Sequence, residues 1–472
     1  MNWSKGQILL IVFITMGIVF VSFYFELYVL LFIPLVFLLG SIIFFKPDLL
    51  FFCLAFLTPL SINPADAELG KLSLSLPTEP IAAVLVLLFF LLFFTTEKVD
   101  KKFLLHPISW LLYIYFAWLL VTSFTSVDKV VSIKFVIAKL WFIIPCYFLA
   151  AIYFKEPKNI YTYLYLFVFG LSLVAMFNIV HLATYGFEDK PSQWTMQPFF
   201  KDHTILGAIL ALVIPLSFGL IRLDRGNKFR QISLFGFTLI LLTCLVVTFS
   251  RAAWVSIIPA LLLFLILFFK LRFKYVLMLV GFGLFYLFSN LDVILMDLEH
   301  NKVAGSDDVI ENAESISNIS TDPSNLERIN RWACAIEMWK DKPYFGWGPG
   351  TYMFEYAPFQ LRGNYTAIST NFGDVGNAHS EYLGPLAETG VLGLLIFAAL
   401  FVMVFVFGFR AYFRSTMKAE KILLSTVMCA LITYFVHGFL NNFLDTDKAS
   451  NIFWPLIAII VVMDLKLART KY

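Results

Sequence analysis

The chain has 472 residues, of which 60% are hydrophobic and only 14% are charged. A soluble domain is roughly 45–50% apolar and about 25% charged, so this composition excludes an ordinary soluble protein and predicts a polytopic membrane protein. The formal net charge of +3 says little about partners, and we expect membrane lipids but no nucleic acid among them.

Apolar segments long enough to cross a bilayer recur along the whole chain, since one span needs about 20 residues. The candidate spans are 7–25, 27–45, 48–62, 78–95, 107–125, 133–153, 160–184, 203–222, 231–249, 252–269, 274–291, 381–409, 420–442 and 450–466. They predict an all-α fold with about 12–14 transmembrane helices. No small-residue cleavage site follows Ile8–Phe25, so we interpret that run as a retained helix rather than a signal peptide.

The loops between these spans alternate in charge. Basic clusters occur in 97–102, 155–158, 222–230, 270–274 and 410–421, and at the end of the chain. By the positive-inside rule these segments face the cytoplasm, which places both termini there and requires an even number of spans.

The opposite side then carries the loops 63–77 and 185–202, the turn at Ser250–Arg251, and the long segment 292–380. Such a long segment is usually functional or disordered rather than a plain connector. It divides the chain into N-terminal transmembrane helices (1–291), a large outer loop domain (292–380) and C-terminal transmembrane helices (381–472).

Part of this loop domain has a helical pattern. Apolar residues recur on one face between Asn325 and Trp339, which predicts a helix. Asp341–Pro343 should end it, and Gly346–Gly350 should form a tight turn. The preceding stretch, Ala304–Pro323, is rich in Ser, Asp, Asn and Glu and reads as a mobile segment.

Two groups of arginines stand out, because positive charge is disfavoured on the outer side. Arg251 lies in a short turn between two spans, where it either contacts lipid headgroups or clamps a phosphate, which a guanidinium matches bidentately. Arg328 and Arg331 are neighbours on the predicted helix. They are either a surface pair balanced by Glu327 and Asp322 or part of a binding site.

His379 lies where the polar loop meets a new apolar helix, which we expect to continue through Gly390 and Gly393. An imidazole can exchange protons near neutral pH, and a titratable group beside the bilayer is a functional candidate. Histidines in such chains are also often structural, which is how we interpret His437. His203, at another outer helix start, lies between the functional and the structural interpretation. The two glycines favour close helix packing.

Few features of the sequence support a nucleotide site, a pair of catalytic carboxylates or a metal site. The chain has no Gly-rich nucleotide loop and no evident pair of catalytic carboxylates, and its five Cys form neither a CxxC motif nor a Cys/His cluster. Asp445 and Asp447 in an outer loop are a metal possibility that nothing else supports. We therefore expect neither a metal nor a cofactor.

Three motifs in order give the chain a resemblance to the O-antigen ligase family over about 200–460. They are Ser250–Trp254, then Arg328–Trp332 running into Pro343–Tyr352, then His379–Ser380 followed after nine residues by Gly390–Leu394. The family comprises polytopic glycosyltransferases of the GT-C-like class, which act on polyprenyl-pyrophosphate glycans. The N-terminal part resembles the family in hydropathy only.

The resemblance implies a catalytic site open to the periplasm of a bacterial inner membrane. It assigns the base to His379 and pyrophosphate binding to Arg251 and Arg328. Arg328 rather than Arg331 matches, because the family has an arginine followed after three residues by a tryptophan, here Trp332.

Four further residues complete the expected site as candidates for substrate binding. Arg331 is a reserve for Arg328, His203 starts an outer helix, and Trp332 and Ser380 adjoin the matched arginine and histidine.

The resemblance also implies the reaction. A glycan on undecaprenyl pyrophosphate is already activated, so transfer to a sugar hydroxyl of lipid A-core needs no nucleotide. Arg251 and Arg328 would stabilise the leaving pyrophosphate, and neutral His379 would deprotonate the acceptor. Without a clear second carboxylate, we expect direct displacement with inversion.

Three alternatives remain open. A polysaccharide polymerase would use the same donor with a lipid-linked acceptor. A protein O-oligosaccharyltransferase is less favoured, since such enzymes tend to have Thr where this chain has Leu394. A transporter of lipid-linked glycans would often show repeated halves, and we find no repeat.

Overall fold

The computed structural model describes residues 46–65, 74–224, 226–270, 323–360 and 376–469. The chain divides into two compact units, Met1–Cys53 and Leu54–Tyr472. All of the site residues expected from the sequence belong to the second unit.

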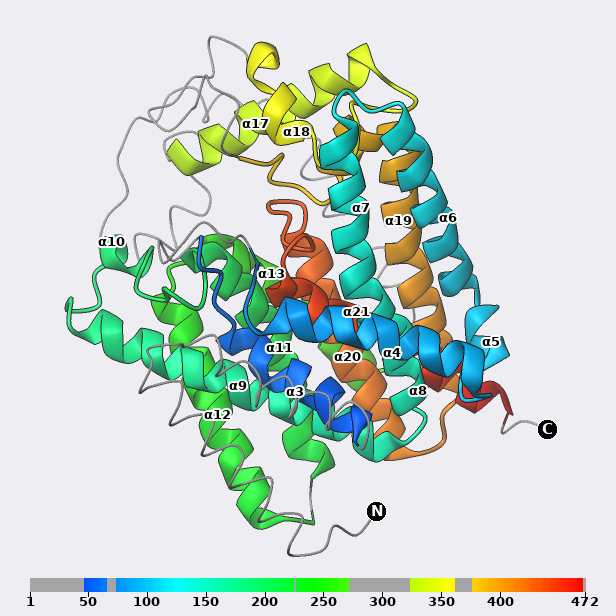
Figure 1. The fold of residues 1–472 in the computed structure, drawn as a ribbon. Helices are drawn as coiled ribbons and strands as arrows, with labels where there is room; N and C mark the ends of the chain where they lie inside the picture. The colour runs from blue at the N-terminus through cyan, green and yellow to red at the C-terminus, as the bar shows by residue number, and fades with distance from the viewer. Residues whose placement is uncertain (1–45, 66–73, 225, 271–322, 361–375, 470–472) are drawn as a thin grey trace, which may run out of the picture. The chain divides into compact units, whose positions relative to one another are not determined.

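The described residues are organised almost entirely as helices (Figure 1). In chain order these are α3 (Pro47–Leu60), α4 (Thr78–Thr95), α5 (Lys101–Leu104), α6 (Pro107–Phe124), α7 (Lys129–Ile143), the π-helix η2 (Ile144–Leu149), α8 (Ala150–Tyr153), α9 (Pro157–Ala183), α10 (Asp189–Ser192), α11 (His203–Leu223), α12 (Lys228–Val247), α13 (Arg251–Phe268), α17 (Pro323–Asp341), α18 (Tyr352–Glu355), the 3-10 helix η4 (Ala357–Phe359), α19 (Leu383–Arg414), α20 (Lys418–His437) and α21 (Asp447–Arg469).

Within the described ranges, ten helical segments are long and apolar enough to cross a membrane. This confirms the expected all-helical polytopic membrane protein. The expected spans 7–25, 27–45 and 274–291 lie outside the described residues, and 48–62 corresponds to the shorter apolar helix α3.

The centre of the second unit is formed by α11, α20 and α21. α11 packs against α12, α13 and α20, while α21 packs against α19 and η2. α11 and α21 are the most buried of the spans.

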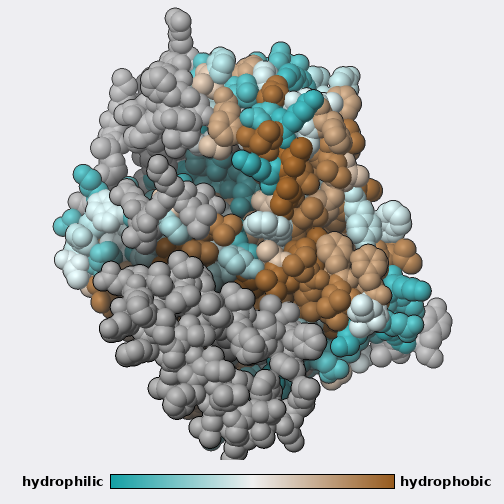
Figure 2. All heavy atoms as spheres, viewed as in Figure 1, coloured by the Kyte–Doolittle hydropathy of each residue, from teal (hydrophilic) through white to brown (hydrophobic). Residues whose placement is uncertain are grey.

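Large apolar side chains on other helices are exposed, among them Phe94, Phe235 and Ile258. Figure 2 shows hydrophobic residues gathered over α4 and α7. Such surfaces match the hydrocarbon of a bilayer.

The loop helix expected at Asn325–Trp339 is confirmed as α17, which ends at Asp341 as predicted. α17 packs on α19, and α19 packs on α6 (Figure 1). The expected mobile stretch Ala304–Pro323 lies outside the described residues, apart from Pro323, the first residue of α17.

The expectation that one continuous helix runs through Gly390 is wrong. Gly390 has φ +71° and ψ −171°, so α19 consists of two helical pieces joined at this residue. A Cβ at this position would lie 2.1 Å from the backbone oxygen of Tyr344. Glycine is needed here both for the left-handed backbone and for the close approach.

The turn after α17 fits into this break. The backbone N–H of Val391 donates to the carbonyl of Pro343 at 3.1 Å, and that of Gly348 donates to the carbonyl of Glu388 at 2.8 Å. Gly346, Gly348 and Gly350 all have positive φ, which confirms the expected tight turn. These hydrogen bonds fix the end of α17, the helix that carries Arg328, to α19, the helix that follows the His379 loop.

Candidate active site

His203 is the first residue of α11. Asp202 caps the helix, because its Oδ1 accepts from the backbone N–H groups of Thr204 at 2.8 Å and Ile205 at 3.1 Å. The half-buried imidazole of His203 is therefore held at the helix start. Its buried Nδ1 has no hydrogen-bond partner among the described residues.

Arg251 begins α13 directly after a sharp turn in which Phe249 has φ +49°. This turn packs tightly on the first turns of α11. A Cβ on Gly207 would lie 2.7 Å from the Cβ of Ser250, so only glycine permits the approach. The start of α13 is thereby brought beside the start of α11, which carries His203.

Arg328 of α17 joins this group. Burial and the charge of Arg251 lower the pKa of Arg328 to about 10, and Asp202 opposes the shift. A guanidinium with this pKa is still charged at neutral pH. Arg251 and Arg328 are therefore two cations close enough to repel one another, and an anion bound between them would relieve that repulsion. Guanidinium groups match phosphate oxygens in particular.

Arg331 is not a surface residue, since only 4% of it is exposed. Its Nε donates to Glu327 Oε1 at 2.7 Å, and its guanidinium lies 4.6 Å from the centroid of the Tyr356 ring. Its Nη1 also donates to the carbonyl of Asn377 at 3.5 Å. Arg331 thus supports the segment that leads into His379. Asp322, its other expected partner, lies outside the described residues.

The backbone of His379 is held in a left-handed conformation, with φ +46°. Such a conformation is uncommon for a residue other than glycine. Two hydrogen bonds hold it: the His379 N–H donates to Asn377 Oδ1 at 3.0 Å, and Trp332 Nε1 donates to the His379 carbonyl at 3.3 Å. Ser380 is buried, and its hydroxyl accepts from the backbone N–H groups that start α19.

The His379 side chain is a neutral imidazole at neutral pH. Burial and the charges of Arg328 and Arg331 lower its pKa to about 4, against a weaker opposing hydrogen bond with the Asn441 side chain. Asn441 also donates its amide N–H to His437 Nε2 at 3.0 Å. A neutral imidazole held by a third group has the arrangement expected of a general base.

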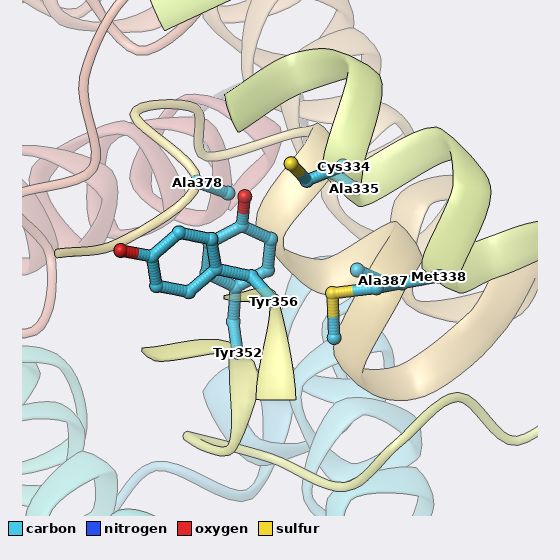
Figure 3. Packing of buried hydrophobic residues seen from close by; sticks show 7 residues of the cluster. All are labelled: Cys334, Ala335, Met338, Tyr352, Tyr356, Ala378 and Ala387. Carbon is cyan, nitrogen blue, oxygen red and sulfur yellow. The ribbon is translucent and has the colours of Figure 1, made fainter. Parts of the chain in front are cut away.

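A small hydrophobic core holds α17 against α19 (Figure 3). The rings of Tyr352 and Tyr356 are stacked with their centroids 5.4 Å apart. The Tyr352 hydroxyl donates to the carbonyl of Arg331 at 2.7 Å. Ala378, next to His379, belongs to the same core. The core therefore fixes the arginine helix and the histidine loop to each other.

The structure thus brings together His203, Arg251, Arg328 and His379 from four separate segments. Arg331, Trp332 and Ser380 lie around the His379 backbone. Figure 2 shows a recess with a hydrophilic floor beneath α17 and α18. Among the described residues, no group of three or more His, Cys, Asp or Glu side chains is arranged to hold a metal ion.

Sequence reasoning missed Asp202, Asn377 and Asn441. Asp202 could have been found, because an aspartate before an apolar helix is a capping signal. Asn377 and Asn441 gave no comparable signal, since their partners are distant in the sequence or depend on the left-handed backbone at His379.

Residues 236–398 match the family model described as O-antigen ligase. This segment begins within α12 and ends within α19, and it contains Arg251, Arg328 and His379. No curated protein matches the chain.

Proposed function

We propose that this polytopic membrane protein, whose residues 236–398 match the O-antigen ligase family model, is an enzyme of that family with a specific reaction. The enzyme transfers a glycan from undecaprenyl pyrophosphate to a sugar hydroxyl of lipid A-core. Transfer takes place on the periplasmic side of the bacterial inner membrane, with both termini in the cytoplasm.

The observation that carries the proposal is the pair of guanidinium groups beside a neutral histidine. The charge of Arg251 acts on Arg328, and the charge of Arg328 acts on His379. The donor's pyrophosphate would bind at the two arginines. Negative charge grows on the leaving group during transfer, and one preorganised cation is worth about 3 kcal/mol at such a position.

His379 would accept the proton of the acceptor hydroxyl. As the acceptor oxygen bonds to the anomeric carbon of the donor sugar, the bond from that carbon to the pyrophosphate oxygen breaks. The leaving pyrophosphate takes the electron pair, and the proton stays on His379. A positioned base of this kind contributes roughly 10²–10⁴-fold. Attack from the face opposite the leaving group inverts the anomeric centre.

We assign to the remaining expected site residues the roles of holding the His379 loop and contacting the pyrophosphate. Arg331 and Trp332 hold the backbone at Asn377 and at His379, and the Ser380 hydroxyl accepts from backbone N–H groups at the start of the helix that follows. His203 lies beside the two arginines and would contact the pyrophosphate.

Purified protein with an undecaprenyl-pyrophosphate glycan tests the proposal. It is offered lipid A-core in one reaction and a second lipid-linked glycan in another. We expect transfer to lipid A-core, and polymer on the lipid-linked acceptor would instead identify a polymerase. Arg251→Gln and Arg328→Gln should each raise donor KM and lower kcat, with exposed Arg230→Gln as the matched control. Undiminished turnover of donor in both variants would remove the arginines from the pyrophosphate site.

A further inference from the structure

A second feature adjoins the His379 loop, a cavity of about 210 Å³ between α6, α7, α19 and α21. We call it the α19 cavity. His379 is not on its wall, but the neighbouring residues Ala378 and Ser380 are. A ligand in the cavity would therefore lie next to the loop that carries the candidate base. The cavity is smaller than the ~300–1,000 Å³ of sites for drug-sized ligands, so it suits a single ring.

The charge of the cavity is opposite to that of the arginine site. Its wall carries three carboxyl groups, those of Glu381, Glu388 and Asp445, against the single ammonium of Lys139. Lys139 Nζ is already paired with Asp445 Oδ1 at 2.6 Å. Such a lining offers a phosphate no cation other than the paired Lys139, and any ionised carboxylate on the wall repels it. The donor's pyrophosphate is thereby directed to Arg251 and Arg328.

Two buried polar atoms on the same wall indicate what kind of ligand would fit. Trp454 is 3% exposed, and its Nε1 donor has no hydrogen-bond partner in the part of the chain that the structure describes. The buried Oδ1 acceptor of Asn442 likewise has none there. Buried polar groups are normally satisfied, so each such exception calls for an explanation.

A hydroxyl group can satisfy both atoms, because it donates one hydrogen bond and accepts others. The carboxylates of Glu381 and Glu388 keep acceptor capacity for further hydroxyls. Glu381 Oε1 accepts from the backbone N–H of Leu444 at 2.9 Å and from the Tyr434 hydroxyl at 2.7 Å, and Glu388 Oε1 accepts from the backbone N–H of Tyr352 at 3.1 Å. The rest of the wall is largely apolar, including Phe135 and Phe397, and can cover the C–H faces of a ring.

We propose that the α19 cavity binds the acceptor sugar as a neutral ring. The hydroxyls of this ring form hydrogen bonds with Trp454, Asn442 and the two glutamates. This inference rests on the proposed transferase function. It divides the site by charge, with the phosphate of the donor at the arginines and the uncharged acceptor in the cavity that adjoins the His379 loop. It also sets specificity, since a neutral sugar should bind better than the same sugar carrying a phosphate.

The kinetic test uses full-length protein with Trp454→Phe, which keeps an aromatic ring but removes the N–H, and Asn442→Leu, which removes the amide. Each variant should raise acceptor KM roughly 3–10-fold, the effect of one hydrogen bond, and leave donor KM and kcat unchanged. Trp110→Phe on the exposed face of α6 is the matched control and should change nothing. Unchanged acceptor KM in both variants would overturn the proposal, as would a rise in donor KM alone, which would assign the cavity to the donor's lipid.

Methyl glucoside and glucose 6-phosphate serve as probes of charge. Methyl glucoside should inhibit competitively against the acceptor and not against the donor. Glucose 6-phosphate should inhibit at least several-fold more weakly against the acceptor. Equal inhibition by both sugars would contradict the charge argument.

A binding measurement separates this inference from the proposed function. Saturation-transfer NMR titrations should detect methyl glucoside on wild-type protein and on His379→Ala protein with similar Kd, and Trp454→Phe and Asn442→Leu should each raise this Kd roughly 3–10-fold. If wild-type protein transfers no glycan but shows this pattern, the reaction is wrong and the sugar site stands. If transfer occurs and the binding signal is the same in every variant, the reaction stands and the cavity assignment is wrong.

Discussion

Trp332 donates its indole N–H to the backbone carbonyl of His379 at 3.3 Å, and so links the arginine helix to the candidate base. Trp332 lies one turn after Arg328 on α17, so the same helix that presents a cation to the site also holds the histidine backbone. The left-handed backbone of His379 needs this support, since a residue in such a conformation persists only when its surroundings enforce it.

Replacing Trp332 by Phe should therefore lower kcat with little change in donor KM. The substitution keeps the ring and removes one hydrogen bond, which is worth about 0.5–1.5 kcal/mol or roughly 3–10-fold in rate. Steady-state kinetics of glycan transfer measure the effect, with Trp110→Phe as the control. A rise in donor KM at normal kcat would show that Trp332 contacts the donor instead.

The pH dependence of transfer should report the depressed pKa of His379. Because its pKa is about 4, the base is neutral above that pH, and kcat/KM should fall only as the pH drops toward 4. An unperturbed histidine would lose activity near pH 6.5.

Arg328→Gln should move this acid limb to higher pH. The positive charge of Arg328 disfavours the imidazolium, so its removal raises the pKa of His379. The profile of kcat/KM against pH for wild type, Arg328→Gln and the control Arg230→Gln measures the shift. An acid limb at the same pH in all three proteins would contradict the interaction between Arg328 and His379.

Asn441 should act as a positioning residue for the base. Asn441→Leu keeps the branched shape of the side chain but removes its hydrogen bond to His379, and we expect a drop in kcat of about 10-fold or more by analogy with other groups that orient a base. Asn441→Asp adds a negative charge beside the imidazole and should move the acid limb to higher pH. A purely structural role for Asn441 would leave the limb in place in both variants.

Gly390→Ala should destabilise the protein by about 1–3 kcal/mol from its backbone conformation alone, because φ +71° with ψ −171° lies in a region almost restricted to glycine. The clash with the Tyr344 carbonyl, only 2.1 Å from the new Cβ, adds to this. Gly236→Ala in α12 is the matched control, because a Cβ there meets nothing within 4 Å and alanine favours a helix. Thermal unfolding in detergent compares the two, and equal melting temperatures would refute the proposed role of the break.

Much of the fold could be predicted from the sequence, because hydropathy directly reports the residues that face lipid. The spans at 78–95 and 107–125 correspond closely to α4 and α6, and the periodicity of Asn325–Trp339 located α17. The break at Gly390 could not be predicted, since the glycine adopts its conformation only because the turn at Tyr344 docks against it.

The candidate site likewise contains residues that the sequence predicts and contacts that it does not. Arg251 and His379 were found from local sequence, as charged or titratable groups at the ends of apolar helices, and Arg328 was found as an arginine of the outer loop helix that the family motif favours over Arg331. The burial of Arg331, the hydrogen bond of Trp332 to His379 and the contact of Asn441 with His379 depend on packing between distant segments. Periodicity and motif spacing carry no information about such contacts.

The most direct test of the account is a single-turnover measurement with His379→Ala protein, undecaprenyl-pyrophosphate glycan and lipid A-core. The control is His181→Ala, which removes a histidine at the end of α9. Donor binding to the His379→Ala protein should match that of wild type, while the rate of glycan transfer should fall by about 10²–10⁴-fold. Normal transfer by folded His379→Ala protein would contradict the assignment of His379 as the base.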